Sequence, residues 1–319
     1  PPNYVPAALS AAGLAVLFAS VYAGYALYRI IEPTPAFLGL AAVGLGALLL
    51  SRRQGAFIAA LGLLGSYATP ALIASPSPSA WGFFPYLLVI LAASLLTLRG
   101  RGWWWLGHGA IAATLGWSAL WLAGPFDPAD VWPVGVTGLL TGLLAVWTQE
   151  GGAVLRDEAR RPELVGQPRR ARAIGVSGLA AGTLILILLV LRMSHAQDAL
   201  LMLSAGLLLL LLFAWLKQGL SFLAPVAGLV MLAVLAGWRE AAFHAWTLDE
   251  LGLWSWSSSP GPEVERFLRW ALGAGAAFTL AGSAGVLGRP VKRHWGALGG
   301  GAAALFVMGA WSRADFMFT

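Results

Sequence analysis

Long apolar segments separated by short polar turns follow one another along the whole chain. A membrane span needs about 20 mostly apolar residues, because a helix rises 1.5 Å per residue across a hydrocarbon core of about 30 Å. Eleven segments approach this length, at residues 6–28, 35–50, 55–74, 80–98, 103–123, 131–148, 173–191, 199–216, 219–237, 267–288 and 296–311. The pattern therefore predicts an all-α polytopic transmembrane helix bundle of about eleven spans.

One long polar interval, residues 149–172, separates the first six spans (1–148) from the last five (173–319). Six arginines lie in it: Arg156, Arg160, Arg161, Arg169, Arg170 and Arg172. Arginines beside a span resist translocation, so this interval is predicted to be a basic cytoplasmic loop. Its position fixes the direction of every other span.

The other connections between spans alternate between basic and acidic along the chain, in agreement with a cytoplasmic basic loop. Connections on the side of the basic loop hold 14 basic residues against 4 acidic ones, whereas the opposite side, with both chain ends, holds 6 against 10. Because basic loops stay in the cytoplasm, both ends of the chain are predicted to lie outside. The expected location is an inner (cytoplasmic) membrane.

The longest outward connection, residues 238–266, mixes aromatic and acidic residues. Phe243, Trp246, Leu253 and Trp254 among Glu240, Asp249 and Glu250 are typical of a helix that lies in the membrane interface. We therefore expect an interfacial helix at 238–256, with Trp246 and Trp254 turned toward lipid.

Tryptophans and glycines mark the ends and the contacts of the spans. Amphipathic rings favour the headgroup layer, which predicts interfacial anchors at Trp81, Trp103, Trp104, Trp105, Trp121, Trp132, Trp147, Trp215, Trp238, Trp270, Trp295 and Trp311. Small residues spaced by four let helices approach closely, which predicts contacts at Gly138/Gly142, Gly178/Gly182 and Gly296/Gly300.

Composition narrows the class of protein. Only 11% of the residues are charged and 59% are hydrophobic, whereas a soluble domain carries about 25% charge. The basic pI of about 10.2 fits cytoplasmic loops, so no nucleic-acid partner is expected. The absence of cysteine excludes disulfides, thiolate metal sites and cysteine nucleophiles.

A family resemblance rests on the first third of the chain. Residues 61–75 read LGLLGSYATPALIAS after the turn RRQG at 52–55, and residues 4–28 read YVPAALSAAGLAVLFASVYAGYALY. Over roughly residues 4–121 the chain resembles the bacterial multi-pass proteins of domain of unknown function 2339. Members are longer, with a polar N-terminal region, so the resemblance implies an internal portion of a longer protein. It implies no chemistry.

The third span holds the candidate pocket. Pro70 removes a backbone donor, which should kink the helix and free a carbonyl near Ser66. Ser66, Tyr67 and Thr69 either line a small outward-facing polar pocket with Tyr86 or satisfy the backbone groups that the kink leaves; we prefer the second interpretation. In both cases they should point into the protein or a cavity, because irregular backbone is not tolerated against lipid.

A second candidate is the outer polar pair His195 and Asp198, which we interpret as a charged exposed turn. The topology separates His108 and His294 from His195 and His244, which excludes a three-histidine zinc site. A mixed site of His195, His244 and outer carboxylates remains open. No metal, cofactor or catalytic residue is predicted.

The sequence offers little chemistry inside the membrane. The span interiors hold only His108 and Arg269 as ionisable groups, whereas ion coupling needs acids or bases there. We therefore expect a non-catalytic structural or accessory component that packs with membrane lipids, other subunits or the remainder of its own chain. An uncoupled transporter or lipid-handling protein with an outward-facing cavity is the alternative, and a membrane-embedded transferase is the third.

The charge pattern makes a direct prediction about topology. A reporter enzyme that is active only in the periplasm should be active when fused after Ala129 and silent when fused after Pro162. Reporter activity in whole cells is the measurement. Equal activity at both fusion points would contradict the alternating arrangement.

Overall fold

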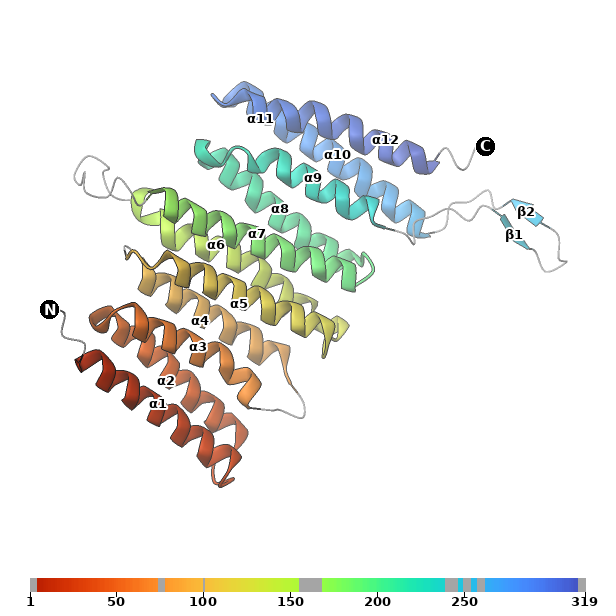
Figure 1. Ribbon diagram of the computed structural model, residues 1–319. Helices are drawn as coiled ribbons and strands as arrows, with labels where there is room; N and C mark the ends of the chain where they lie inside the picture. Colours follow the sequence, from red (N-terminus) through yellow and green to blue (C-terminus); the bar gives the residue numbers. More distant parts are fainter. Residues whose placement is uncertain are drawn as a thin grey trace. The chain divides into compact units, whose positions relative to one another are not determined.

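The computed structural model describes residues 5–73, 78–99, 101–154, 168–238, 246–248, 254–256 and 262–314 (Figure 1). The predicted all-α class is confirmed, since nearly all of these residues are helical. The chain divides into two compact units, Pro1–Leu189 and Val190–Thr319. Their boundary falls inside a helix, about 20 residues past the basic interval that separates the predicted sets of spans.

The first unit is a series of helices that run up and down in turn (Figure 1). In order they are α1 (Val5–Ala26), α2 (Pro33–Gln54), α3 (Ala56–Leu72), α4 (Ala80–Leu98), α5 (Trp104–Ala123), the one-turn helix η1 (Pro128–Asp130), α6 (Val131–Val154) and α7 (Pro168–Arg192). Only Gly55 separates α2 from α3, with φ of 101°, a value that glycine adopts without strain. This tight turn holds the two helices side by side.

The helices of the second unit also run up and down in turn (Figure 1). It holds α8 (Gln197–Leu216), η4 (Gln218–Leu220), α9 (Leu223–Ala236), strands β1 (Trp246–Leu248) and β2 (Trp254–Trp256), α10 (Pro262–Gly288), α11 (Lys292–Gly296), the π-helical segment η6 (Ala297–Gly301) and α12 (Ala302–Ala314). Helix α10 packs against α9, α11 and α12. These helices form the core of the unit.

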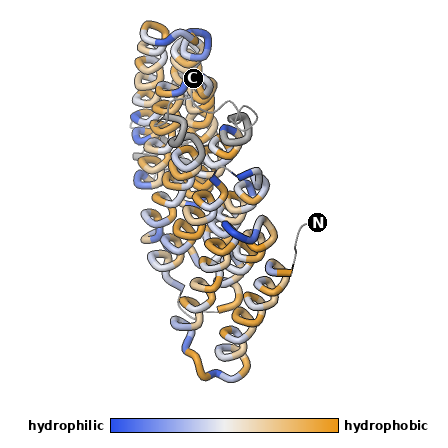
Figure 2. The backbone as a smooth tube through the Cα atoms, turned by 90° about the vertical axis from the view of Figure 1, so that its left-hand side faces the viewer, coloured by the Kyte–Doolittle hydropathy of each residue, from blue (hydrophilic) through white to orange (hydrophobic). Residues whose placement is uncertain are grey.

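Eight helical segments in the described part of the chain are long and apolar enough to cross a membrane: α1, α2, α4, η1 with α6 (Pro128–Thr148), α7, α8, η4 with α9 (Gln218–Ala236) and α10. Helix α3 is apolar but has 17 residues. Figure 2 shows hydrophobic residues along the helices, with hydrophilic stretches mostly near the turns. This distribution suits a bilayer, in which a helix satisfies its own backbone hydrogen bonds.

Several helices extend beyond their predicted bounds. Helix α2 begins two residues earlier than predicted, because Pro33 fits the first turn, where a backbone N–H lacks a partner. Helices α6 and α7 reach Val154 and Pro168, inside the interval predicted as a loop. The remainder of that interval lies outside the described residues. The last predicted span is divided by the π-helical segment at 297–301.

Glycines bring α6 and α7 together in the first unit. The two predicted pairs, Gly138/Gly142 and Gly178/Gly182, face each other across this contact. A methyl group at Gly182 would collide with the Gly138 carbonyl oxygen, and one at Gly142 would lie 3.0 Å from Leu179. The α6–α7 contact therefore depends on the absence of side chains at these positions.

In the second unit the close contact uses glycines other than the predicted pair. A methyl group at Gly282 would collide with the backbone of Gly299, and one at Gly285 would collide with the Trp295 ring. Gly300 has nothing within 4 Å of such a methyl group, and Gly296 only a side-chain carbon at 3.8 Å. The predicted Gly296/Gly300 contact is wrong, because the π-helical segment turns Gly299 toward α10 instead.

The predicted interfacial helix at 238–256 is wrong for the described residues. Strands β1 and β2 pair antiparallel there, with Trp246 opposite Trp256 and Leu248 opposite Trp254. Tryptophan and threonine fit a pleated strand well, and strand pairing supplies the backbone hydrogen bonds that a helix would otherwise provide. Residues 239–245 and 249–253 lie outside the described part of the chain.

The α6–α7 contact generates a stability prediction. Gly182→Ala should lower the free energy of unfolding by about 1–3 kcal/mol, because the added methyl group overpacks the contact. Gly116→Ala is the matched control, since nothing lies within 4 Å of its added methyl group and alanine favours a helix over glycine by about 1 kcal/mol. Denaturant unfolding in mixed micelles measures both. A loss of stability at Gly116 equal to that at Gly182 would argue against the contact.

Candidate functional site

The candidate residues of the third span lie in the interior of the first unit. Ser66 and Thr69 are fully buried, and Tyr67 is 7% exposed. They occupy the second half of α3, which contacts α2, α4 and α5. As predicted, these three side chains point into the protein and not toward lipid.

Pro70 and Tyr86 form a matched pair. In a regular helix the N–H of residue 70 would donate to the carbonyl oxygen of Ser66, but proline has no N–H. The hydroxyl of Tyr86, on α4, donates to this same Ser66 oxygen at 2.6 Å. Tyr86 also packs on Phe37 of α2, with ring centroids 4.7 Å apart. The freed carbonyl predicted from Pro70 is therefore satisfied by a neighbouring helix.

Tyr67 links α3 to α5. Its hydroxyl donates to the Ala110 carbonyl oxygen at 3.0 Å and lies 2.8 Å from the Thr114 hydroxyl. The indole N–H of Trp117 donates to the Tyr67 carbonyl oxygen at 2.9 Å. This contact includes α5 residues that the sequence analysis did not select. Thr114, Trp117, Ser118 and Trp121 recur at helical spacing along one face of α5, and this spacing could have indicated the contact from the sequence.

The two remaining hydroxyls behave differently. Thr69 donates to the Gly65 carbonyl oxygen at 2.9 Å, one turn earlier in its own helix. The Ser66 hydroxyl oxygen makes no hydrogen bond within the described part of the chain. It lies against Gly44 of α2, where a methyl group would collide with it. Ser66 thus lies at a close contact between α2 and α3.

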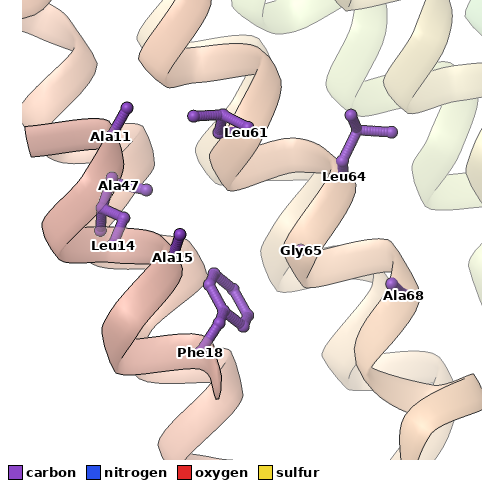
Figure 3. Close-up of a pocket in the computed structure, with 9 residues that line it drawn as sticks. All are labelled: Ala11, Leu14, Ala15, Phe18, Ala47, Leu61, Leu64, Gly65 and Ala68. Atoms are coloured by element: carbon purple, nitrogen blue, oxygen red, sulfur yellow. The ribbon is translucent and has the colours of Figure 1, made fainter. Parts of the chain in front are cut away.

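A groove in the first unit lies beside these residues but is lined by others. It has a volume of about 290 Å³ and is lined by Ala11, Leu14, Ala15, Phe18, Ala47, Leu61, Leu64, Gly65 and Ala68 (Figure 3). All nine are apolar, and they come from α1, α2 and α3. Ser66, Tyr67, Thr69, Pro70 and Tyr86 are not among them.

The structure does not join the predicted outer pair. His195 is buried, with φ of 61°, and its Nε2 atom lies 3.1 Å from the Val234 carbonyl oxygen. Its ring stacks on Trp238 at 4.9 Å between centroids. Asp198 is exposed in the first turn of α8. Among the described residues no hydrogen bond or ion pair connects the two.

Metal binding has no candidate in the described ranges. No group of three or more histidine, aspartate and glutamate side chains there could hold an ion. The two other described histidines each pair with serine: His108 Nδ1 with Ser177 at 3.0 Å, and His294 Nδ1 with Ser221 at 2.8 Å. His244, part of the mixed site left open above, lies outside the described residues.

Helical bundles of long apolar helices, with buried hydroxyls bonded to neighbouring backbone, define the class of polytopic integral membrane proteins. The family model described as a predicted membrane protein, domain of unknown function 2339, matches residues 2–313. The chain belongs to this family. The match confirms the resemblance seen in the sequence and extends it past residue 121. No curated protein and no solved structure matches the chain.

The Pro70–Tyr86 pair can be tested with a double-mutant cycle. Tyr86→Phe leaves the Ser66 carbonyl oxygen without a donor, which should lower the free energy of unfolding by about 1–3 kcal/mol. In a Pro70→Ala background the helix regains its own donor, so the same change should cost much less. Denaturant unfolding of the four proteins is the measurement. An equal cost of Tyr86→Phe in both backgrounds would show that the hydroxyl does not serve the freed carbonyl.

Proposed function

We propose that this chain is a non-catalytic structural component of a membrane assembly, located in the bacterial cytoplasmic membrane. The supporting observation is the use of its buried polar groups. The hydroxyls of Tyr67 and Tyr86 donate to backbone carbonyls of neighbouring helices, and Thr69 donates within α3. These groups hold the helices together, which leaves them unsuited to bind a substrate at the same time.

The surface of α1 supports a packing role. Within this helix of 22 residues only Leu14 and Gly24 are buried, whereas Leu9 and Val16 are 69% and 63% exposed. The groove beside it is bordered by small residues, namely Ala11 and Ala15 of α1 and Gly65 and Ala68 of α3. Small residues allow a further helix to approach closely. We therefore propose that another membrane span packs along α1 and α3.

The proposed topology has eleven spans with both chain ends outside. In the first unit the basic α2–α3 and α4–α5 turns meet, because Arg101 donates to the Arg52 carbonyl oxygen at 2.9 Å. In the second unit Arg289, after α10, stacks on Trp215 near the end of α8 at 4.3 Å. Basic turns that gather at one end of each unit support a cytoplasmic position for that end.

A lipid-handling role is the second candidate, and the apolar groove supports it. Its volume of about 290 Å³ is near the lower limit of ligand pockets, about 300 Å³. Its side chains are all hydrocarbon, which suits part of an acyl chain. The groove therefore has two proposed occupants, a protein helix and a lipid chain, that an experiment can separate.

Photo-crosslinking in intact cells distinguishes these occupants. A benzophenone-bearing amino acid replaces Leu64, which borders the groove and is 65% exposed. We expect it to capture one membrane-spanning protein, identified by mass spectrometry. The same probe at Leu280 of α10, 72% exposed, is the matched control and should not capture that protein.

A variant with a filled groove provides the second part of the crosslinking experiment. Ala15→Trp with Ala68→Trp should abolish the crosslink at position 64, because the large rings occupy the space that the partner helix needs. A crosslink that persists would place the partner elsewhere. Capture of lipid alone at position 64, lost in the filled variant, would instead favour the lipid-handling role.

A further inference from the structure

Two turns at one end of the second unit form a single surface, which we call the basic turn pair. The first turn follows α8 and includes Lys217 and Ser221, and the second joins α10 to α11. The Ser221 hydroxyl lies 2.8 Å from Nδ1 of His294. The rings of Trp215 and Trp295 meet edge to face, with centroids 5.6 Å apart. These contacts fix the two turns to each other.

The basic turn pair is rich in cations. Arg289, Lys292 and Arg293 lie in it, and residues 199–238 and 266–314 contain no aspartate or glutamate. Like charges held close together repel one another unless an anion is added. The charge pattern therefore favours a negatively charged ligand at this surface.

Arg289 is arranged to receive such an anion. Its guanidinium carbon lies 4.3 Å from the centroid of the Trp215 ring. Its Nε atom is buried and makes no hydrogen bond within the described part of the chain. Contact with the Trp215 ring restricts the movement of the guanidinium group, whose planar fork of N–H groups fits two phosphate oxygens.

The apolar surroundings indicate the source of the phosphate. Leu216 and Leu287 come directly before the two turns and are 61% and 87% exposed. The half-buried Trp215 ring suits the boundary between headgroups and acyl chains, which tryptophan favours. A phosphate bound at this depth has hydrocarbon surface next to it. A soluble anion gains nothing from that surface, whereas a lipid covers it with its acyl chains.

We propose that the basic turn pair binds the headgroup of an anionic glycerophospholipid. The phosphodiester lies on Arg289, Lys292 and Arg293, and the acyl chains follow Leu216 and Leu287. A lipid with a net negative headgroup, in which no amine neutralises the phosphodiester, fits this surface better than a zwitterionic lipid. Basic pockets between spans bind anionic headgroups by the same physical chemistry.

The equivalent turns of the first unit provide a matched control. There the Arg101 guanidinium group donates to the Arg52 carbonyl oxygen at 2.9 Å, so part of its hydrogen-bonding capacity is already used within the protein. The side chains of Arg52 and Arg53 are exposed. Replacing them removes two charges from a basic turn without touching the proposed site.

Native mass spectrometry of the full chain tests the proposal, with phosphatidylglycerol and phosphatidylcholine of identical acyl chains as probes. The unchanged chain should bind its first phosphatidylglycerol roughly 30-fold more tightly than phosphatidylcholine, since Lys292 and Arg293 near an anionic headgroup each contribute about a fivefold gain. Lys292→Gln with Arg293→Gln should remove most of that preference. Arg52→Gln with Arg53→Gln should retain it.

Three outcomes would overturn the proposal. Equal binding of the two lipids would exclude a headgroup site, and equal losses in both double variants would indicate a general surface charge. Displacement of phosphatidylglycerol by millimolar inorganic phosphate would assign the surface to a soluble anion. Arg289→Lys keeps the charge but loses the stacked fork, so it should weaken phosphatidylglycerol binding at unchanged helix content; unchanged binding in this variant would contradict the role of Arg289.

Discussion

Hydrogen bonding inside hydrocarbon is the constraint on which this structure depends. A bilayer supplies no donors or acceptors, so each polar group within a span needs a partner in the protein. Hydroxyls accordingly donate to carbonyl oxygens one turn earlier, as Thr114 does to Ala110 and Thr141 to Thr137. Where proline removes a helical donor, a tyrosine of the next helix replaces it. The candidate pocket is thus explained by helix packing.

Close approach of helices is the second consequence of the same environment. Lipid is as apolar as leucine, so packing and small residues hold spans together instead of a hydrophobic force. Glycines supply this approach between α6 and α7 and between α10 and η6. By contrast α1 shares few buried positions with its neighbours. This difference within the first unit makes α1 the natural place for a further span to pack.

Much of the fold followed from the sequence, because length and hydropathy are local properties. Helix α4 occupies residues 80–98 as predicted, and the other predicted spans are helical within a few residues of their expected bounds. The freed carbonyl at Ser66 was also predictable, since it depends only on the position of Pro70. The family resemblance was carried by the same region and is confirmed.

Apart from the glycine pairs of α6 and α7, only the tertiary structure decided which faces meet. Trp238 and Trp295 were predicted to anchor at the interface, yet both are buried, whereas Trp81 is 66% exposed. The partners of Tyr67 lie more than 40 residues away on α5. Spans that are apolar on nearly every side carry no amphipathic signal to show which face turns inward. The sequence therefore determined where the helices are, and the packing of neighbouring helices determined which of their side chains became core, contact or surface.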